Sequence, residues 1–214
     1  MKTKFTTIIA TVALLLSTST LTFAGVKTDD NGAAVTSTEL KQVGKIDAIE
    51  ASGNVDVYIM NGDNDAVKVY SDYYGENAVV QNEDGVLRIA SYGNDKLMVL
   101  VTVSDLHSIT ANDEAFVKTY GDALSAKSLL VDLNDKAVAV LKLDAIAAGI
   151  TVNGDARADL YGMVENYSLA RSATSTVNKD QLESYASRVK TLAQPKAART
   201  HAFVNLGANA ALLN

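Results

Sequence analysis

The chain has 214 residues with no cysteine and one proline, 48% of them are hydrophobic, and the formal net charge is −6. The lack of cysteine excludes a disulfide framework, a thiolate metal site and a cysteine nucleophile. The acidic excess argues against a nucleic-acid-binding protein, which needs a basic surface, and the hydrophobic content excludes a wholly disordered chain.

The first 24 residues have the three parts of a secretory signal peptide. Lys2 and Lys4 form a short positive segment, residues 8–16 are apolar, and small residues precede a cleavage point between Ala24 and Gly25. The apolar run is shorter than the roughly 20 residues that a membrane span needs. We therefore expect an exported chain located in the periplasm, at the outer surface or outside the cell. An uncleaved anchor or a buried N-terminal helix is the alternative.

After the signal peptide the sequence divides into two parts. Residues 25–39 are rich in Thr, Asp, Gly and Ser and are predicted to be a flexible leader. Residues 40–214 are predicted to form one domain, because they are enough for a substantial core. No apolar run in this part reaches membrane length, so the mature chain is predicted to have no integral membrane span.

The first part of the domain has the signals of strands joined by tight turns. Residues 46–60 include an alternation of apolar and polar positions, which is typical of a half-buried strand. Asn61-Gly62 favours a hairpin-type turn before a strand at residues 66–70. Asp84-Gly85 predicts another turn before a strand at 86–90. The continuous apolar run at 97–103 predicts a strand that is covered on both faces.

From residue 106 onward a short unit recurs, with an apolar strand, a small polar corner and an alternating strand. An equivalent of this unit also occurs earlier in the chain, at Ser52. The second residues of the aligned units are Ser52, Asn112, Asn134, Asn153, Arg171 and Arg199. Successive spacings from 112 to 171 are 22, 19 and 18 residues, and the interval from 52 to 112 has room for three such units. A period near 20 residues is typical of a β-solenoid, because one turn alone cannot bury its apolar face but stacked turns can.

We therefore predict an all-β fold, a right-handed parallel β-helix-like solenoid. An antiparallel β-sandwich is the alternative, since sandwich strands also recur every 8 to 12 residues. Residues 181–198 are the least strand-like part of the domain. Their apolar positions could form one face of a short helix that ends at Pro195; these positions are Leu182, Tyr185, Val189 and Leu192.

The order of these elements resembles the head GIN domain family (DUF2807) of autotransporter-like adhesins. Ile49, Gly53, Val57 and Ile59 stand where that family has its opening motif, and residues 85–89 match its Gly-x-Leu-x-Ile step. The resemblance covers about residues 40 to 205. Where the family typically has Gly-Ser-Gly corners this chain has Asn and Asp, which also tolerate tight bends. The resemblance implies the fold and a surface role, and it implies no catalytic or ligand-binding residue.

The residues that commonly carry chemistry are sparse. His107 and His201 are not in a metal-binding spacing and are predicted to be surface or corner residues. Asp63 and Asp65 are similar to the start of a calcium loop, but the downstream glutamate is missing, so a solvated turn is predicted. No phosphate-binding loop or nucleophile elbow is present.

The corner acids are the best candidate cluster. If the turns stack, Asp113, Asp135 and Asp155 would form a surface ladder at about 4.8 Å per turn. Because like charges repel, such a ladder must bind a cation, interleave with Lys136 or Arg157, or spread into solvent. A second cluster contains four tyrosines that could stack on sugar rings or simply pack at a strand edge; they are Tyr70, Tyr73, Tyr74 and Tyr92.

These patterns predict a non-enzymatic exported domain with a surface-interaction or adhesin-like role. The expected partner is a surface glycan or an envelope protein, not a nucleic acid. A polysaccharide-binding or polysaccharide-cleaving protein that uses the acidic corners is the alternative. No cofactor is expected, apart from Ca²⁺ in a third hypothesis, a calcium-stabilised carbohydrate-binding module.

Overall fold

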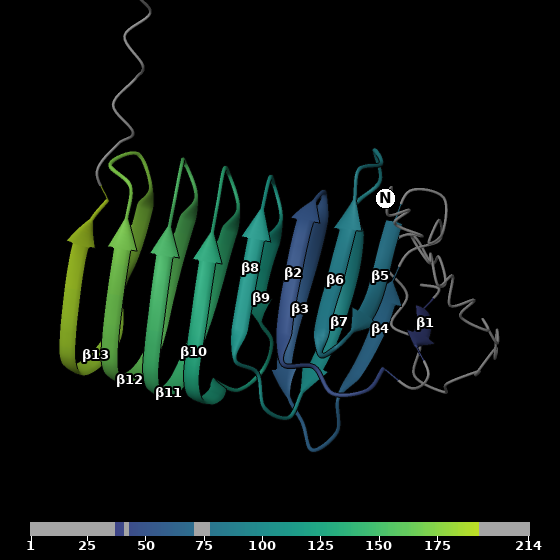
Figure 1. Ribbon diagram of the computed structural model, residues 1–214, viewed down its shortest axis with the longest axis horizontal. Coiled ribbons are helices and arrows are strands. Elements are labelled where there is room, and N and C mark those ends of the chain that lie inside the picture. Colours follow the sequence, from purple (N-terminus) through teal and green to yellow (C-terminus); the bar gives the residue numbers. More distant parts are fainter. Residues whose placement is uncertain (1–36, 41–42, 71–77, 193–214) are drawn as a thin grey trace, which may run out of the picture.

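The computed structural model describes residues 37–40, 43–70 and 78–192 (Figure 1). All secondary-structure elements in these ranges are strands, which confirms the predicted all-β class. The strands are β1 (Ser37–Leu40), β2 (Ala48–Gly53), β3 (Val55–Asn61), β4 (Ala66–Tyr70), β5 (Ala78–Glu83), β6 (Val86–Ser91), β7 (Leu97–Val103), β8 (Ser108–Asn112), β9 (Phe116–Thr119), β10 (Leu124–Leu133), β11 (Val138–Val152), β12 (Arg157–Arg171) and β13 (Thr176–Thr191).

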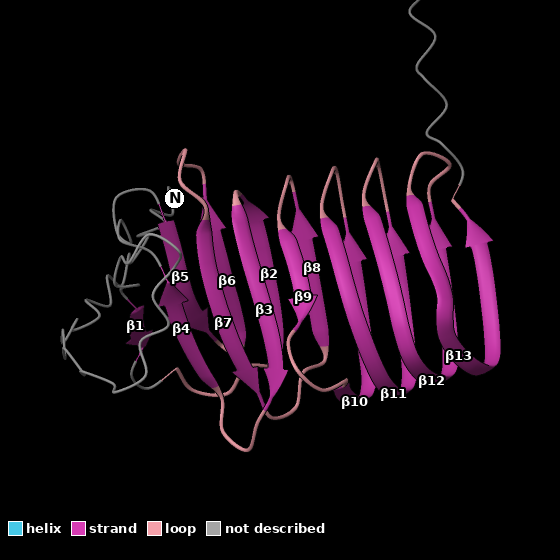
Figure 2. Cartoon of the chain, turned by 180° about the vertical axis from the view of Figure 1, so that it is seen from behind, coloured by secondary structure: helices cyan, strands magenta, loops and turns pink. Residues whose placement is uncertain are grey.

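These strands form one mixed sheet that curls until two arms face each other (Figures 1 and 2). One arm contains β7, β3, β9 and the first half of β11, and the other contains β6, β2, β8 and the second half of β10. From β10 onward each strand bends and so takes part in both arms. The pairing skips one exposed residue at each bend; these residues are Lys127, Ile146, Glu165 and Tyr185.

The core is the aliphatic layer between the two arms. Alternate residues of each strand point inward, so that Val57 and Ile59 on one arm and Ile49 and Ile109 on the other are fully buried. This period-two burial is what the sequence alternation predicts. Most of the large buried side chains are Ile and Leu, which suits a narrow core between closely facing arms.

The strands that follow Leu106 pair in parallel, turn on turn. Val131 pairs with both Ile109 and Ile150, and Ile150 pairs with Leu169, all in parallel ladders. This pairing does not correspond to the antiparallel β-sandwich that we considered as the alternative. Equivalent residues of successive strands therefore lie side by side, which explains the regular corner spacing.

The interval between residues 52 and 112 does not hold three further turns. It holds one, β6 with β7, which stacks on the outer side of β2 and β3, while β8 and β9 stack on their other side. The expectation is wrong because β5 and β6 form an antiparallel hairpin. At its turn Asp84 and Gly85 have φ values of 51° and 81°, which makes the predicted reversal.

Antiparallel strands close the end of the sheet next to this turn. β4 pairs antiparallel with β7 on one side and with β1 on the other. β3 and β4 therefore do not form the hairpin that Asn61-Gly62 predicts, because β7 lies between them. β1 contains the last three residues of the predicted leader, Ser37 to Glu39, and the rest of that leader lies outside the described residues.

The predicted helix near the C-terminal end is wrong for residues 181–192. β13 continues as a strand to Thr191 because each half of it pairs in parallel with β12, and this pairing overrides the helical spacing of the apolar residues. Pro195, His201 and the repeat copy at Arg199 lie outside the described residues, as do the predicted signal peptide and its cleavage point at Ala24 and Gly25.

Candidate functional site

The corners at one edge of the curled sheet are held together by a ladder of side-chain amides. Asn153 Nδ2 donates to Asn134 Oδ1 at 2.9 Å, and Asn134 Nδ2 donates to Asn112 Oδ1 at 2.9 Å. Asn112 Nδ2 donates to Ser52 Oγ at 3.3 Å. Four of the six predicted corner positions therefore stack in register, and their polar groups satisfy one another.

The fifth predicted position, Arg171, is not part of this ladder. Arg171 pairs with Val152 inside β12, and the Ser172 amide donates to the Val152 carbonyl, as the Asn153 amide does to Leu133. Ser172 is thus the residue equivalent to Asn153, and the spacing is 19 rather than 18 residues. The predicted corner is displaced by one residue because Arg171-Ser172-Ala173 fits the repeat pattern in either register.

The predicted acid ladder has two members instead of three. Asp113 and Asp135 occupy equivalent corner positions with φ values of 60° and 61°. The next equivalent residue is Gly154, with φ 62°, and Asp155 lies one position further along, where its amide donates to the Asp135 carbonyl at 2.7 Å. Gly, Asn and Asp adopt a left-handed conformation most easily. The residue type at these three equivalent positions is therefore explained by the backbone conformation.

The cations that could interleave with the ladder acids pair with other carboxylates. Lys136 Nζ lies 3.7 Å from Glu114 Oε1, and Asp135 Oδ2 accepts a long hydrogen bond from the Asp113 amide at 3.4 Å. Arg157 does not contribute, because it forms a two-bond ion pair with Asp159 on the outer side of β12. Within the described ranges no three Asp, Glu or His side chains come close enough to hold a metal ion.

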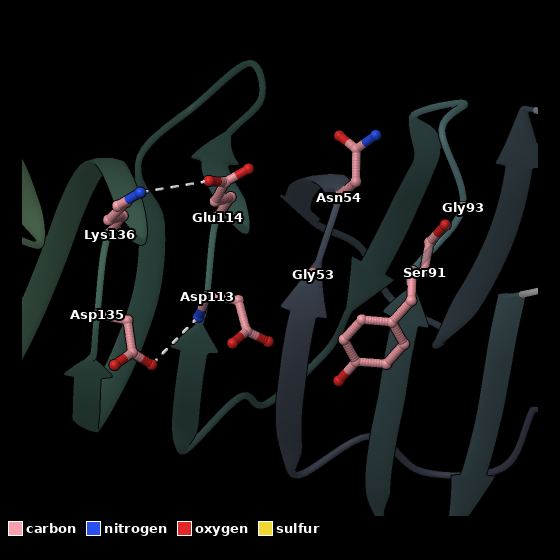
Figure 3. A pocket seen from close by; sticks show the side chains of 9 residues that line it. Gly53, Asn54, Ser91, Gly93, Asp113, Glu114, Asp135 and Lys136 are labelled. Atoms are coloured by element: carbon pink, nitrogen blue, oxygen red, sulfur yellow. Dashed lines mark hydrogen bonds and ion pairs between the residues drawn. The ribbon is translucent and has the colours of Figure 1, made fainter.

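Two of these corners line a depression of about 430 Å³ that we call the notch (Figure 3). Its floor is the corner between β2 and β3, and its walls are the taller corners on either side. The lining residues are Gly53, Asn54, Ser91, Tyr92, Gly93, Asp113, Glu114, Asp135 and Lys136. The notch therefore brings together two predicted acids, Asp113 and Asp135, and one predicted tyrosine, Tyr92.

The other candidate residues have structural positions. Asp65 accepts hydrogen bonds from the Ile46 and Ser104 amides at 2.6 and 2.7 Å, so its carboxylate joins two loops. Asp63 lines an open depression beside it. His107 is half exposed, with Nδ1 3.7 Å from Asp47, and Lys45 binds the same carboxylate at 2.6 Å, a hydrogen bond that raises the pKa of Lys45.

The predicted tyrosine cluster is not a single patch. Tyr92 lies at the notch, whereas Tyr70 ends β4 on the outside of the opposite arm. Tyr73 and Tyr74 lie outside the described residues.

A surface that the sequence patterns did not single out lies on the outside of the arm formed by β7, β3, β9 and β11. Alternate outward positions there are apolar, although the inward positions form the core. We call this surface the aromatic face, and its members are Met98, Leu100, Tyr58, Met60, Phe116, Tyr120, Val138 and Val140. Met98 and Tyr120 are 40% and 56% exposed. The prediction that β7 is covered on both faces is therefore wrong, because its outward face is partly exposed.

The register of four strands makes this surface continuous. Met98, Asp56, Phe116 and Val138 lie side by side across the sheet, and Leu100, Tyr58, Lys118 and Val140 form the next row. The Tyr58 ring contacts Phe116 and Tyr120 edge to face, each with ring centroids 6.4 Å apart. Asp56, the one acid within the rows, is neutralised by Lys96 at 3.0 Å.

A comparison with protein families matches residues 45–200 to the family described as "Putative auto-transporter adhesin, head GIN domain" (DUF2807). The chain belongs to this family. The match confirms the resemblance that the strand motifs and corners indicate, and it spans all strands of this head GIN domain except β1.

Solved structures resemble this head GIN domain in fold. A putative adhesin from Parabacteroides merdae ATCC 43184 is 12% identical, with a TM-score of 0.55 over 73% of this chain and 77% of that one. A putative adhesin from Parabacteroides distasonis ATCC 8503 is 16% identical, with a TM-score of 0.56 over 73% and 78%. A putative lipid binding protein from the same organism is 12% identical, with a TM-score of 0.55 over 73% and 78%.

A search of curated proteins found no match to this head GIN domain. The described part of the chain contains no helix that could cross a membrane. Neither finding adds a catalytic or ligand-binding residue to the two surfaces described above.

Proposed function

We propose that this head GIN domain is an exported, non-enzymatic interaction module with an adhesin-like role. Its partner is a protein of the cell envelope or of a cell surface, and the aromatic face holds that protein. The continuity of the aromatic face across four strands is the observation that carries the proposal. The family assignment supports it, because the description of that family names an adhesin.

The chemistry of the aromatic face fits a protein partner. Protein interfaces are enriched in Tyr, Phe and Met at their centre and have a polar rim. Here Lys118 lies within the second row and Lys142 lies further along β11, and both are exposed, so acidic groups on the partner would complement them. The same lysines would oppose one another if two copies of the chain met face to face, which disfavours self-association through this surface.

The ring geometry disfavours a polysaccharide on the aromatic face. A sugar chain stacks best on rings that lie flat and coplanar at the surface. The Tyr58 ring stands at 66° to Phe116 and at 88° to Tyr120. These rings instead leave an uneven apolar surface that side chains of a protein can fill.

The absence of enzymatic activity is part of the proposal. A glycosidase needs two carboxylates placed on opposite sides of the scissile bond. Asp113 and Asp135 lie on neighbouring turns of the same wall, and Asp135 also accepts from the Asp113 amide. This arrangement supports a structural use of both acids rather than a catalytic pair.

We also propose the finer details of architecture and location. The repeated turns from β8 to β13 would form a right-handed parallel β-solenoid, for which the in-register asparagine ladder is the support. Export would follow cleavage between Ala24 and Gly25. Mass spectrometry of the protein from envelope and culture fractions should find Gly25 as the first residue, and an intact N-terminus there would contradict cleavage.

The domain is further proposed to need no metal for stability. Within the residues that the structure describes, the Glu114–Lys136 ion pair and the hydrogen bonds of Asp65 leave no carboxylate cluster that requires a cation. We expect the same melting temperature with millimolar CaCl₂ and with EDTA, because a ligand that binds only the folded state raises that temperature. An increase with calcium would instead favour the calcium-stabilised module.

Binding of the labelled, purified chain to cells that produce the protein tests the main proposal. We expect saturable binding that is lost when the cells are treated with protease first, and no binding to phospholipid vesicles. Replacing both exposed members of the aromatic face, Tyr120→Ser with Met98→Ser, should weaken binding at least tenfold, since such central residues carry much of an interface's affinity.

A matched control separates this effect from a general loss of apolar surface. Ile146 and Met163 are 52% and 43% exposed and lie away from the aromatic face. The double variant Ile146→Ser with Met163→Ser should bind as the unmodified chain does, and both variants should melt at a similar temperature. Equal binding by the two double variants would contradict the proposal.

A further inference from the structure

We infer that the notch is a second binding site, which takes a pyranose saccharide without acidic groups. This site is separate from the aromatic face and does not depend on it. It is built from corners, whereas the aromatic face is built from the outward side chains of strands.

The notch exists because one corner is much shorter than its neighbours. Asn54 alone separates β2 from β3, whereas residues 92–96 separate β6 from β7 and residues 113–115 separate β8 from β9. The β2–β3 turn lies between the other two in the stack. The two taller corners therefore stand about two strand spacings apart, roughly 9.6 Å, on either side of a low floor.

The floor requires glycine. Gly53 has a φ of 78°, and a Cβ added there would lie 2.2 Å from the Ser91 carbonyl oxygen and 3.2 Å from Tyr92 Cδ1. The Tyr92 ring therefore lies against Gly53, and no side chain could occupy the space between the ring and the backbone. The backbone of Gly53 and Ser91 thus sets the floor of the notch.

One wall is apolar and the other is polar. Tyr92 is 74% exposed and offers its ring to the solvent. Asp113 and Asp135 lie on the opposite wall, below the Glu114–Lys136 ion pair (Figure 3). Asn54 donates through Nδ2 to the Asn94 carbonyl at 3.2 Å, and its Oδ1, which accepts no hydrogen bond from the described residues, could accept one from a ligand.

A saccharide matches this pairing of walls. The C–H face of a pyranose ring packs on an aromatic ring, while its hydroxyl groups donate to carboxylate and amide oxygens. The volume of about 430 Å³ lies within the range of small-molecule sites, roughly 300 to 1,000 Å³. The lining carries three carboxylates and one ammonium group, so a uronic acid or a phosphorylated sugar would be repelled.

Isothermal titration of the purified chain with three hexasaccharides of different charge tests the inference. The probes are cellohexaose, which is neutral, a glucosamine hexamer, which is cationic, and hexagalacturonate, which is anionic. We expect the first two to bind and the third not to bind. Tyr92→Ala should weaken binding of cellohexaose at least tenfold, and Asp113→Asn should weaken binding of the glucosamine hexamer several-fold.

Two control variants distinguish binding at the notch from nonspecific binding to exposed aromatic rings and from binding at the aromatic face. Tyr185 is 84% exposed at the bend of β13, so Tyr185→Ala removes an equally exposed ring far along the stack and should leave binding unchanged. Tyr120→Ser should also leave it unchanged. The inference is overturned if neither uncharged nor cationic probe binds, if the anionic probe binds equally well, or if Tyr92→Ala has no effect.

Discussion

Tyr167 is a core residue whose hydroxyl group has no hydrogen-bond partner among the described residues, although its side chain is 3% exposed. Burying a hydroxyl group without a partner costs free energy that phenylalanine would not cost. We therefore predict that Tyr167→Phe raises the free energy of unfolding by about 1 kcal/mol. Urea unfolding at pH 7 measures this, and a variant less stable than the original chain would indicate a partner for the hydroxyl.

The same residue predicts a pH dependence at the alkaline end. Burial raises the pKa of Tyr167 from 10.0 to about 12, so the unfolded chain loses this proton at a lower pH than the folded chain. Stability is then unaffected below pH 10 and falls as the pH rises from 10 toward 12. Tyr167→Phe should remove that part of the loss, and the difference between the two unfolding curves isolates it from other groups.

Asn134 is the central member of the asparagine ladder, since its side chain both donates and accepts a 2.9 Å hydrogen bond. Asn134→Ala would leave Asn112 Oδ1 and Asn153 Nδ2 without their hydrogen bonds in half-buried positions, although Asn112 Nδ2 would still donate to Ser52. We predict a loss of about 2 kcal/mol in the free energy of unfolding. Asn166→Ala is the control, because Asn166 is exposed and makes one long bond to the Ile146 carbonyl; equal losses would contradict a role for the ladder.

At the scale of the element, β12 depends on one glycine near its bulge. Gly162 has a φ of 97°, and a Cβ there would lie 2.1 Å from the Leu143 carbonyl oxygen of β11. Gly162→Ala must therefore strain or separate two paired strands, and we predict a loss of about 3 kcal/mol or more. Gly149→Ala is the comparison, since its Cβ would meet only the ends of two side chains, Leu130 Cδ2 at 3.0 Å and Ser168 Oγ at 3.4 Å. Thermal unfolding of both variants should show a much larger shift for Gly162→Ala.

The elements that the sequence predicts correctly are those with a strong local signal. The alternation around Val57 and the Asp84-Gly85 turn specify a strand and a reversal through adjacent residues alone. The corners at Asn112, Asn134 and Asn153 were found because the stacking repeats the same residue type. The prediction for Asp155 is wrong because the residue equivalent to Asp113 and Asp135 is Gly154, which has the same left-handed backbone conformation but no carboxylate.

The predictions that are wrong concern features that depend on which strands become neighbours in the sheet. The apolar spacing in β13 fits a helix until β12 supplies a strand to pair with. The position of β6 outside β2, and hence the notch, follows from the lateral order of strands, which periodicity does not encode. The aromatic face has no signal in the sequence alternation, because the outward residues of four separate strands meet only through their register.

At the scale of the whole molecule, the two ends of the stack differ. Antiparallel strands β1, β4 and β5 cover the end next to β6 and β7, whereas in the described part of the chain β13 pairs only with β12. A long edge strand of this kind is a template for pairing with other chains unless charge protects it. Lys179, Arg188 and Lys190 are exposed along β13 and supply such charges.

Because each turn contacts mainly its neighbours, stability should decrease toward that end. We predict that native-state hydrogen exchange gives opening free energies for β13 amides at least about 1 kcal/mol below those of β11, which is paired on both sides. The amides of β11 should exchange only through global unfolding. Equal protection in β11, β12 and β13 would mean that β13 is covered by another part of the chain or by a second copy. Dilution distinguishes these two cases, because protection by a second copy declines as the protein concentration falls.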